Sequence, residues 1–287
     1  MLKSKLILGS ANFGSYYGLN KSSLVKKKEI KKILKFCKNN GVGIIDTAFL
    51  YRNSEKLIGS FTNGEYKIIT KLPRIRKNKD LNNEILKFVK ISLKRLKMKK
   101  IYGLLIHDTK NFFSLNSKKY AVYLNSLKKK GIVKKIGFSI YHPAEVKKIL
   151  NVIKPDIIQL PYNIIDRRFE KDGLLNKLNK KKIEIHARSV FLQGLLLNKS
   201  SKLPRFFYKW KRLFNLRDDF IKKNNLNYMD LALGFVKKNK KINKIVIGIN
   251  SISHLKEILK SKKILKKYPN LQSKNQNLII PYKWTVK

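Results

Sequence analysis

Four side chains suited to acid–base chemistry lie at or just beyond the ends of apolar stretches. Asp46 ends VGIID and precedes Tyr51, Lys71 ends YKIITK, and His107 ends IYGLLIH. An isolated phenol has a pKa of about 10, which is too high for ready proton donation near neutral pH. A nearby ammonium would stabilise the phenolate and lower its pKa, and a carboxylate would hold that ammonium in place. Brought together, these residues would form an acid–base set with Tyr51 as the proton donor.

Each of these residues also has a plain structural interpretation. Asp46 could cap backbone N–H groups at a turn or a helix start. A lysine at a strand end is usually a solvated stem, and a lone histidine is usually a satisfied polar residue. The choice therefore depends on the elements that position these side chains.

Short apolar strands alternate with amphipathic helical patterns along the whole chain. The sequence predicts strands at 5–9, 42–46, 66–71, 101–107, 133–139, 156–160, 183–189 and 242–248. It predicts helices near 24–40, 54–60, 80–97, 116–130, 143–151, 217–224, 228–238 and 253–265. Such alternation favours a parallel sheet.

We therefore predict an α/β fold, a single-domain (β/α)8 TIM barrel over 1–287, with its core at about 5–265 and a C-terminal tail at 266–287. An open doubly wound sheet is the alternative, but LGSANFGSYYG after the first strand lacks the G-x-G-x-x-G spacing. A barrel gathers its chemistry at the C-terminal ends of its strands. Those ends carry Ser10, Asn12, Asp46, Tyr51, Lys71, His107, Ser139, Gln159, Ser189, Gly248 and Asn250.

The charge of the chain is unusually high. Lysine and arginine outnumber aspartate and glutamate 67 to 17, for a formal net charge of +50. This excess could indicate binding to nucleic acid or to an anionic membrane. However, the lysines occur in almost every segment, and no basic arm or nucleic-acid module stands out. We expect a solvated surface, with no specific nucleic-acid partner and no membrane partner.

The remaining composition predicts a soluble, cytoplasmic protein. A single cysteine, Cys37, excludes a disulfide framework, and its place on an apolar helix face predicts a buried, inert thiol. The first residues offer too short an apolar run for a signal peptide, and no stretch approaches the roughly 20 residues that span a bilayer. His142, His186 and His254 lack metal-ligand spacing with a carboxylate, so no metal is expected.

The motifs resemble those of the aldo-keto reductase family, from near the first residue to about residue 265. IIDTAFLYRNSEKLIG is similar to the family's Asp-Thr-Ala…Tyr…Asn/Ser-Glu…Gly signature, IITK to its lysine strand and LLIH to its histidine strand. GIVKKIGFSIY, IIQLPYNIIDRR, ARSVFLQGLLL and IVIGINSISHLKEIL resemble the later strands in the family's order. The resemblance implies NAD(P)H-dependent, reversible reduction of an aldehyde or ketone. Tyr51 would protonate the carbonyl oxygen and His107 would orient it.

The same resemblance implies a nicotinamide site. Ser139 and Gln159 match residues that hold the nicotinamide amide, whereas the family's usual asparagine after the serine is Ile140 here. The family often stacks an aromatic ring under the nicotinamide just before a serine. Arg188 precedes Ser189 in this chain, so the guanidinium plane would have to replace that ring.

The phosphates are expected on the loop after the seventh strand and at the N-terminus of the last helix, where free N–H groups bind phosphate. The candidate contacts are Ser189, Phe191, Gly194, Gly248, Asn250 and Ser251. Family habit favours NADP(H) over NAD(H). Asn250 stands where many relatives have a basic residue, so Lys256 or another lysine would supply the charge for the 2′-phosphate.

Two other functions stay open, and the substrate is not determined. A relative of this fold could sense nucleotide state as a regulatory module with little turnover, and the net charge could by itself bind polyanions. The substrate would be a small carbonyl compound, and a sugar-like compound is one option. Its pocket could involve Phe13, Tyr16, Tyr17, Phe49 and residues 204–214, although RFFYKW (205–210) could equally pack as core.

Overall fold

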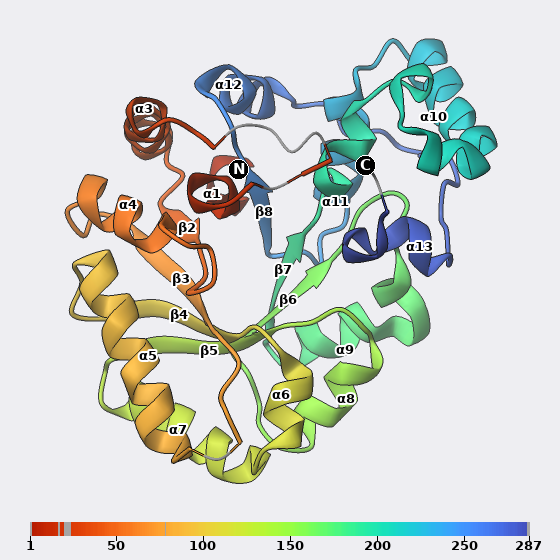
Figure 1. Ribbon diagram of the computed structural model, residues 1–287. Helices are drawn as coiled ribbons and strands as arrows, with labels where there is room; N and C mark the ends of the chain where they lie inside the picture. Colours follow the sequence, from red (N-terminus) through yellow and green to blue (C-terminus); the bar gives the residue numbers. More distant parts are fainter. Residues whose placement is uncertain (1, 17, 20–23, 78, 286–287) are drawn as a thin grey trace.

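Eight parallel strands form a closed barrel. The computed structural model describes residues 2–16, 18–19, 24–77 and 79–285. The strands follow one another around the barrel in chain order, with helices outside (Figure 1). β8 pairs with both β7 and β1, with Leu6 opposite Ile245 and Gly9 opposite Gly248. The predicted (β/α)8 barrel is confirmed.

All eight strands lie within two residues of their predicted positions. They are β1 (Leu6–Gly9), β2 (Ile44–Asp46), β3 (Lys67–Leu72), β4 (Ile101–Ile106), β5 (Val133–Ser139), β6 (Ile157–Pro161), β7 (Glu184–Arg188) and β8 (Lys244–Gly248). The α-helices are α1 (Leu2–Lys5), α2 (Ala11–Gly14), α3 (Lys27–Asn39), α4 (Ser54–Phe61), α5 (Leu81–Leu96), α6 (Thr109–Ser114), α7 (Ser117–Lys129), α8 (Ala144–Leu150), α9 (Leu174–Lys180), α10 (Lys211–Lys223), α11 (Tyr228–Lys238), α12 (Ile252–Lys260) and α13 (Gln276–Ile279). The 3-10 helices are η1 (Arg168–Gly173), η2 (Leu192–Leu197), η3 (Ser200–Lys202), η4 (Arg205–Trp210) and η5 (Pro281–Lys283).

Helix α5 illustrates how local sequence sets the helix ends. The Asp80 side chain accepts a 2.7 Å hydrogen bond from the backbone N–H of Asn83, which caps the first turn. Lys97 adopts the left-handed conformation that ends the helix. Ile85 and Val89, four residues apart, are buried on the face that covers the barrel.

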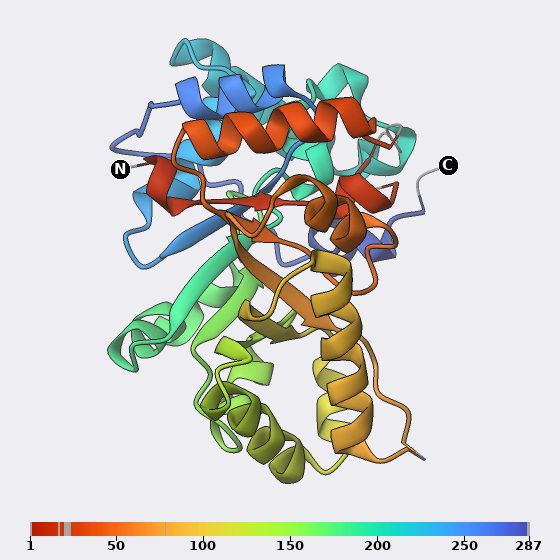
Figure 2. The same cartoon turned by 90° about the vertical axis from the view of Figure 1, so that its left-hand side faces the viewer.

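The barrel separates two apolar cores. A small cluster fills its interior and includes Ile7, Ile69 and Leu105. A much larger cluster lies between the strands and the surrounding helices, where α3 and α12 run side by side (Figure 2). Alternate side chains of each strand thus face inward and outward, which points the last inward residues into the barrel mouth.

The second half of the chain departs most from prediction. Helix α10 begins at Lys211, six residues before the predicted 217, and α12 ends at Lys260 instead of 265. Helix α9 was not predicted, because its sequence LLNKLNK buries only Leu175 and Leu178 and shows no extended period. The tail after residue 265 is packed: its apolar residues Leu271, Leu278, Ile279 and Ile280 are buried.

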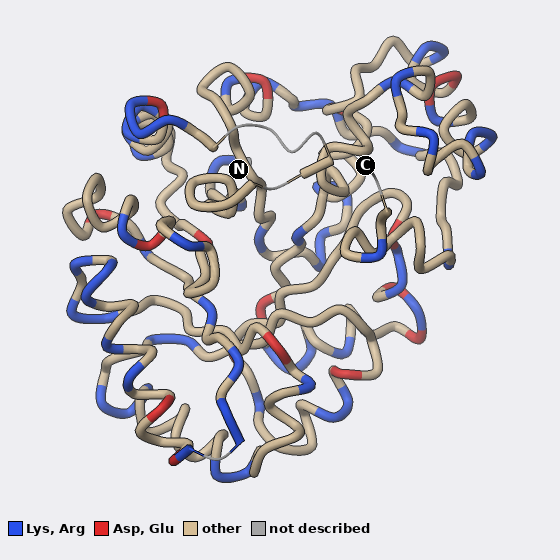
Figure 3. The backbone as a smooth tube through the Cα atoms, viewed as in Figure 1, with Lys and Arg blue, Asp and Glu red and all other residues tan. Residues whose placement is uncertain are grey.

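Basic residues occur on nearly every helix and on several strands, with few acidic residues among them (Figure 3). The described residues therefore show a distributed charge and not one basic face. None of the helices in the described part of the chain is both long enough and apolar enough to cross a membrane.

Candidate active site

The carboxyl ends of β2, β3 and β4 bring the four residues of the predicted acid–base set to one place. Asp46 is the last residue of β2, Lys71 lies in β3, and His107 directly follows β4. Tyr51 belongs to the loop between β2 and α4. The expectation that these side chains share a site depends on a parallel arrangement of the strands, which the barrel provides.

Asp46 and Lys71 form a buried ion pair. The Lys71 ammonium donates to Asp46 Oδ1 at 2.5 Å and to the Thr47 carbonyl at 2.8 Å. The two residues are only 3% and 1% exposed, so neither charge is solvated by bulk water. Asp46 Oδ2 accepts from the Gln159 side-chain amide at 2.7 Å. Both carboxylate oxygens thus accept from side chains. Asp46 is not the N-cap residue of the following helix α4, since that position is Asn53.

Tyr51 lies between the ammonium and the histidine. Its ring centroid is 5.1 Å from Lys71 Nζ and 6.0 Å from the His107 ring, which meets it edge-on at 83°. The phenol ring therefore has both a cation and an imidazole near it. The structure brings together all four residues that the sequence singled out.

The expected lowering of the Tyr51 pKa is wrong for the protein without ligand. Burial of the phenol raises the pKa of Tyr51 well above its usual value of about 10, and the Asp46 carboxylate raises it further. The Arg188 guanidinium acts in the opposite direction. The lysine was expected to dominate, but its charge is balanced by Asp46 inside the same buried pair.

His107 is neutral at physiological pH. Burial lowers the pKa of the imidazole to about 3, and the nearby Lys71 and Arg188 cations add to that effect. Its Nδ1 atom is buried without a hydrogen-bond partner in the described structure. A neutral imidazole carries one N–H donor, so His107 can donate to a substrate oxygen without carrying a charge.

The loop that carries Tyr51 is fixed from the β1 side. Ser54 Oγ donates to the Ser10 carbonyl at 3.0 Å and lies 3.1 Å from Thr47 Oγ1. A Cβ atom added to Gly14 would lie 2.0 Å from the Tyr51 carbonyl oxygen. The backbone of α2 therefore touches the backbone of the tyrosine, and only glycine permits that approach.

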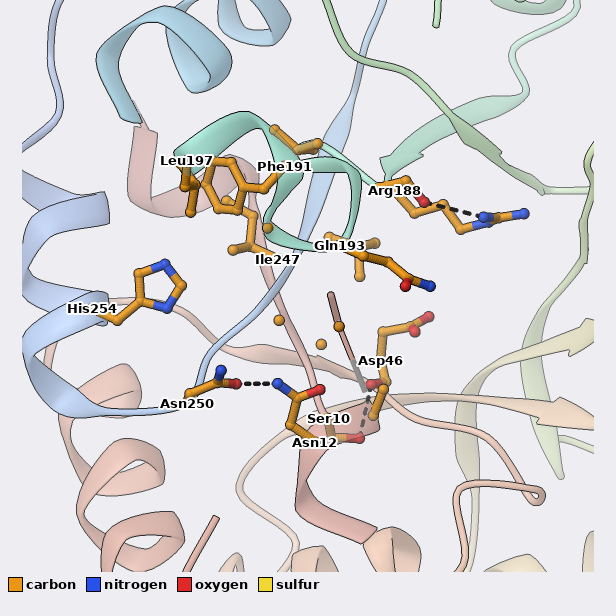
Figure 4. Close-up of a pocket in the computed structure, with 18 of the residues that line it drawn as sticks. Ser10, Asn12, Asp46, Arg188, Phe191, Gln193, Leu197, Ile247, Asn250 and His254 are labelled. Carbon is orange, nitrogen blue, oxygen red and sulfur yellow. Dashed lines mark hydrogen bonds between the residues drawn. The ribbon is translucent and has the colours of Figure 1, made fainter. Parts of the chain in front are cut away.

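A cavity opens from this cluster toward the loops after β7 and β8. Of the expected cofactor contacts, its wall includes Gln159, Arg188, Ser189, Phe191, Gly194, Gly248 and Asn250, together with Asp46 and Tyr51 (Figure 4). Ser139 lines a second cavity instead, and Ser251 lines neither. Ser251 caps α12 by accepting from the His254 backbone N–H at 3.2 Å.

The loop after β7 has an irregular backbone that shapes this cavity. Ser189, Leu192 and Gln193 have positive φ angles of 57°, 46° and 54°. Such conformations are costly for residues with side chains and persist only where the surroundings hold them. Arg217 provides one such constraint, since its buried guanidinium donates to the carbonyls of Leu195 (3.3 Å) and Asn198 (2.6 Å).

His254 lines the wall of the first cavity, a position that the sequence did not indicate, and burial lowers the pKa of its imidazole. Its Nε2 and Asn12 Oδ1 are buried without hydrogen-bond partners among the described residues. The Asn12 amide also donates to Asn250, which joins the β1 and β8 sides of the cavity (Figure 4). Polar histidine and asparagine at loop positions were visible in the sequence, but not their common direction.

A second cavity lies on the other side of the cluster. Its wall includes His107, Ser139 and Tyr141 from the β4 and β5 ends, and Ile280 and Tyr282 from the C-terminal tail. No residue of the tail was expected at the site from the sequence.

The aromatic residues expected around a substrate lie elsewhere. Phe13 is buried in the core, Phe49 packs against Phe88, and Tyr16 is 61% exposed. Tyr17 lies outside the described residues. Neither cavity is lined by any of residues 204–214. Within RFFYKW only Phe207 is buried, against Phe214 and Trp284, whereas Arg205, Tyr208 and Lys209 are exposed.

Comparison with known proteins agrees with this arrangement. The sequence model described as the Aldo/keto reductase family matches residues 5–270. The chain belongs to the aldo/keto reductase family. Among solved structures, an aldo-keto reductase from Bacillus halodurans in its holo form is similar with a TM-score of 0.75 and 22% identity, over 91% of this chain and 88% of that one. Glycerol dehydrogenase from Gluconobacter oxydans gives a TM-score of 0.72 and 21% identity, again over 91% and 88%. A search of curated proteins finds no match.

Membership in the aldo/keto reductase family implies an oxidoreductase that uses a nicotinamide cofactor. The first cavity suits such a group chemically. It joins the buried Gln159 amide at one end to the start of α12 at the other, and its wall contains buried atoms of Asn12 and His254 that have no hydrogen-bond partner among the described residues. Buried polar atoms normally have partners, so these two indicate that a ligand completes the wall.

Proposed function

We propose that this aldo/keto reductase reduces an aldehyde or ketone to an alcohol, with a nicotinamide dinucleotide as the hydride donor. The observation that carries the proposal is the position of Tyr51 and His107 between the two cavities. Tyr51 lines the cavity that suits a cofactor, and His107 lines the other. With ring centroids 6.0 Å apart, the two side chains converge on a space where a carbonyl oxygen could accept from both.

Tyr51 would donate the proton in spite of its raised pKa. Hydride addition turns a carbonyl into an alkoxide, which is about as basic as hydroxide and far more basic than a phenolate. Proton transfer from the phenol is therefore downhill once the hydride has moved. Until then a raised pKa keeps Tyr51 protonated. Lys71 then stabilises the resulting phenolate, and Asp46 holds the ammonium in place.

His107 would orient the substrate without exchanging a proton. Its low pKa of about 3 keeps it neutral, so it can donate one hydrogen bond to the carbonyl oxygen. That bond fixes the direction of the carbonyl relative to the Tyr51 hydroxyl. Ser139 lies close by, at the end of β5.

The bound cofactor would supply the hydride, and side chains of the first cavity would bind the cofactor. Gln159 uses its side-chain N–H on Asp46, so its carbonyl oxygen is the atom that would accept from the nicotinamide amide. Ser189, Phe191 and Gly194 would lie along the dinucleotide, with Asn250 at its far end.

We propose NADP(H) as the preferred nucleotide, held by the N-terminal turn of α12 with Asn250 and Ser251. Lys256 is a poor candidate for the 2′-phosphate, since its ammonium lies 5.9 Å from the Phe36 ring and it does not line the cavity. The described wall contains no lysine at all, so discrimination against NADH should be modest.

Titration of the purified protein with NADPH and with NADH, followed by nucleotide fluorescence, tests the proposal. We expect one nucleotide per chain and reduction of small aldehydes with either nucleotide. Absence of nucleotide binding at millimolar concentration would overturn the proposal. Binding without turnover on a broad panel of carbonyl compounds would favour a nucleotide-sensing role instead.

A further inference from the structure

Arg188 occupies an unusual place at the boundary of the two cavities. It is the last residue of β7 and lines the first cavity. Its guanidinium lies 4.1 Å from the centroid of the Tyr141 ring, which lines the second. Its charge also acts on both central residues, since it lowers the pKa of Tyr51 and that of His107. A permanent cation therefore acts on both residues that would contact the carbonyl oxygen.

The guanidinium is held by neutral groups. Nη2 donates to the Ile140 carbonyl at 3.0 Å, and Nη1 donates to Ser189 Oγ at 3.3 Å. No acidic side chain of the described residues pairs with it, and its Nε is buried without a partner. Arginine at a partly buried position normally binds a carboxylate or a phosphate.

The orientation of Arg188 does not suit a platform under the nicotinamide. In Figure 4 its side chain extends away from Phe191, Leu197 and His254, which enclose the other part of the first cavity. The bond to the Ile140 carbonyl and the contact with Tyr141 direct it toward the β5 end, where the second cavity begins. The guanidinium thus lies beside Tyr141, a wall residue of the second cavity.

The second cavity has more basic than acidic side chains in its wall. Arg74, Lys110, Lys148 and Arg168 face Asp108 and Glu145, four against two. Arg74 pairs with Asp108 at 3.2 Å, and Arg168 pairs with Asp166 at 2.8 Å outside the wall. Glu145 is used internally, since it accepts from the backbone N–H of His142 at 2.6 Å.

The two lysines carry the available positive charge. Neither Lys110 nor Lys148 pairs with an acidic side chain within the described part of the chain. Arg168 does not add to it, because its charge is balanced by Asp166. The wall therefore favours a ligand that carries negative charge.

We propose that Arg188 binds an anionic group of the substrate, so that the enzyme selects carbonyl compounds that carry a carboxylate or a phosphate. This inference rests on the proposed function and narrows its substrate class. The anionic group lies against the Arg188 guanidinium, while the carbonyl oxygen lies between Tyr51 and His107. Lys110 and Lys148 raise the local concentration of such substrates.

Matched pairs of substrates test the inference at constant ionic strength. Succinic semialdehyde is compared with butanal for the carboxylate, and glyceraldehyde 3-phosphate with glyceraldehyde for the phosphate. For Arg188→Gln we expect the anionic-to-neutral ratio of kcat/KM to fall roughly 10- to 100-fold, the range of a lost hydrogen bond to a charged group. Arg188→Lys should recover part of the ratio. The pair with the larger change identifies the anionic group.

Arg212→Gln is the matched control, because it removes the same charge as Arg188→Gln. Arg212 is an exposed residue of α10 that lines neither cavity. The ratio should not change in this variant. An Arg188→Gln variant with an unchanged ratio would overturn the inference, as would an equal fall in the Arg212→Gln variant.

Direct binding of small anions to the wild-type protein tests the inference without turnover and without a variant that must fold. In calorimetric titrations of the wild-type protein, succinate should bind and succinamide should not. Equal binding of the two, or no binding of either succinate or glycerol 3-phosphate, would overturn the inference. Failure of the proposed function is a separate result, since it appears as absence of nucleotide binding and of butanal reduction.

Discussion

Replacing Asp46 by asparagine removes one charge from the buried pair while keeping the shape of the side chain. The Asp46 and Lys71 residues are 3% and 1% exposed, and Nζ is 2.5 Å from Oδ1. Removing one member of such a pair leaves an uncompensated buried charge and costs about 3–5 kcal/mol. For a domain of this size that corresponds to a fall in melting temperature of roughly 5–15 °C.

The same substitution should reduce turnover per folded molecule. Without the carboxylate, the ammonium that supports the Tyr51 phenolate loses its anchor. A displacement of about 1 Å at a reacting group can cost about 100-fold in rate, so we expect kcat to fall at least 100-fold. The asparagine Nδ2 would also face the Gln159 N–H, two donors in contact. Gln159 must then turn its amide, so nucleotide affinity should fall as well.

A double-mutant cycle with Lys71→Met separates the pair from its members. The Asp46→Asn/Lys71→Met variant contains no unpaired buried charge, so it should melt at a higher temperature than either single variant. Glu65→Gln is the control, since Glu65 pairs with Lys38 at the surface, where both side chains are well exposed and such pairs contribute about 0–1 kcal/mol. Melting curves and kcat per folded molecule are the measurements. Additive losses of stability, or a kcat for Asp46→Asn within threefold of wild type, would refute the reasoning.

Three further outcomes follow from the site. Tyr51→Phe should lower kcat by about 10²–10⁴-fold with nucleotide affinity unchanged by fluorescence titration, and a variant that keeps a tenth of the rate would require another proton donor. Gly14→Ala should lower kcat because its Cβ would lie 2.0 Å from the Tyr51 carbonyl oxygen, whereas Gly43→Ala, with nothing within 4 Å, should be harmless; equal kinetics for the two would contradict this contact. His107 has a pKa of about 3 in the folded state against about 6.5 unfolded, so its contribution to stability is complete above pH 6.5 and is lost as the pH falls toward 3. The melting temperature should drop less between pH 7.5 and 4.5 in His107→Asn than in wild type. An equal drop would show that His107 does not contribute to the pH dependence of stability.

Much of the barrel and the central cluster could be predicted because both depend on local patterns. Each strand is a short apolar run, and the barrel rule then places Asp46, Lys71 and His107 at one mouth. The pKa of Tyr51 could not be predicted in this way. It depends on burial and on the balance between Asp46 and its neighbours, which only the folded structure defines.

The role of the C-terminal tail could not be predicted from the sequence either. Its residues have no period that points to a barrel, and Ile280 and Tyr282 reach the second cavity only through the path of the folded chain. The substrate contacts were misplaced for a related reason. An aromatic residue such as Phe13 or Phe49 suits a pocket and a core equally well in composition, and packing decides which of them it occupies.

Asp46 binds three different groups at once, and this limits which substitutions the protein can accept during evolution. One carboxylate oxygen accepts from Lys71, on the side of the proposed proton donor, and the other accepts from Gln159, on the side of the proposed nucleotide site. Its backbone carbonyl accepts from the N–H and the hydroxyl of Ser10, at 2.9 and 3.0 Å. In the proposed mechanism, a change at this position would therefore damage turnover and nucleotide recognition together. A descendant that gave up catalysis but still reported nucleotide levels would keep Asp46 and lose Tyr51 or His107 instead.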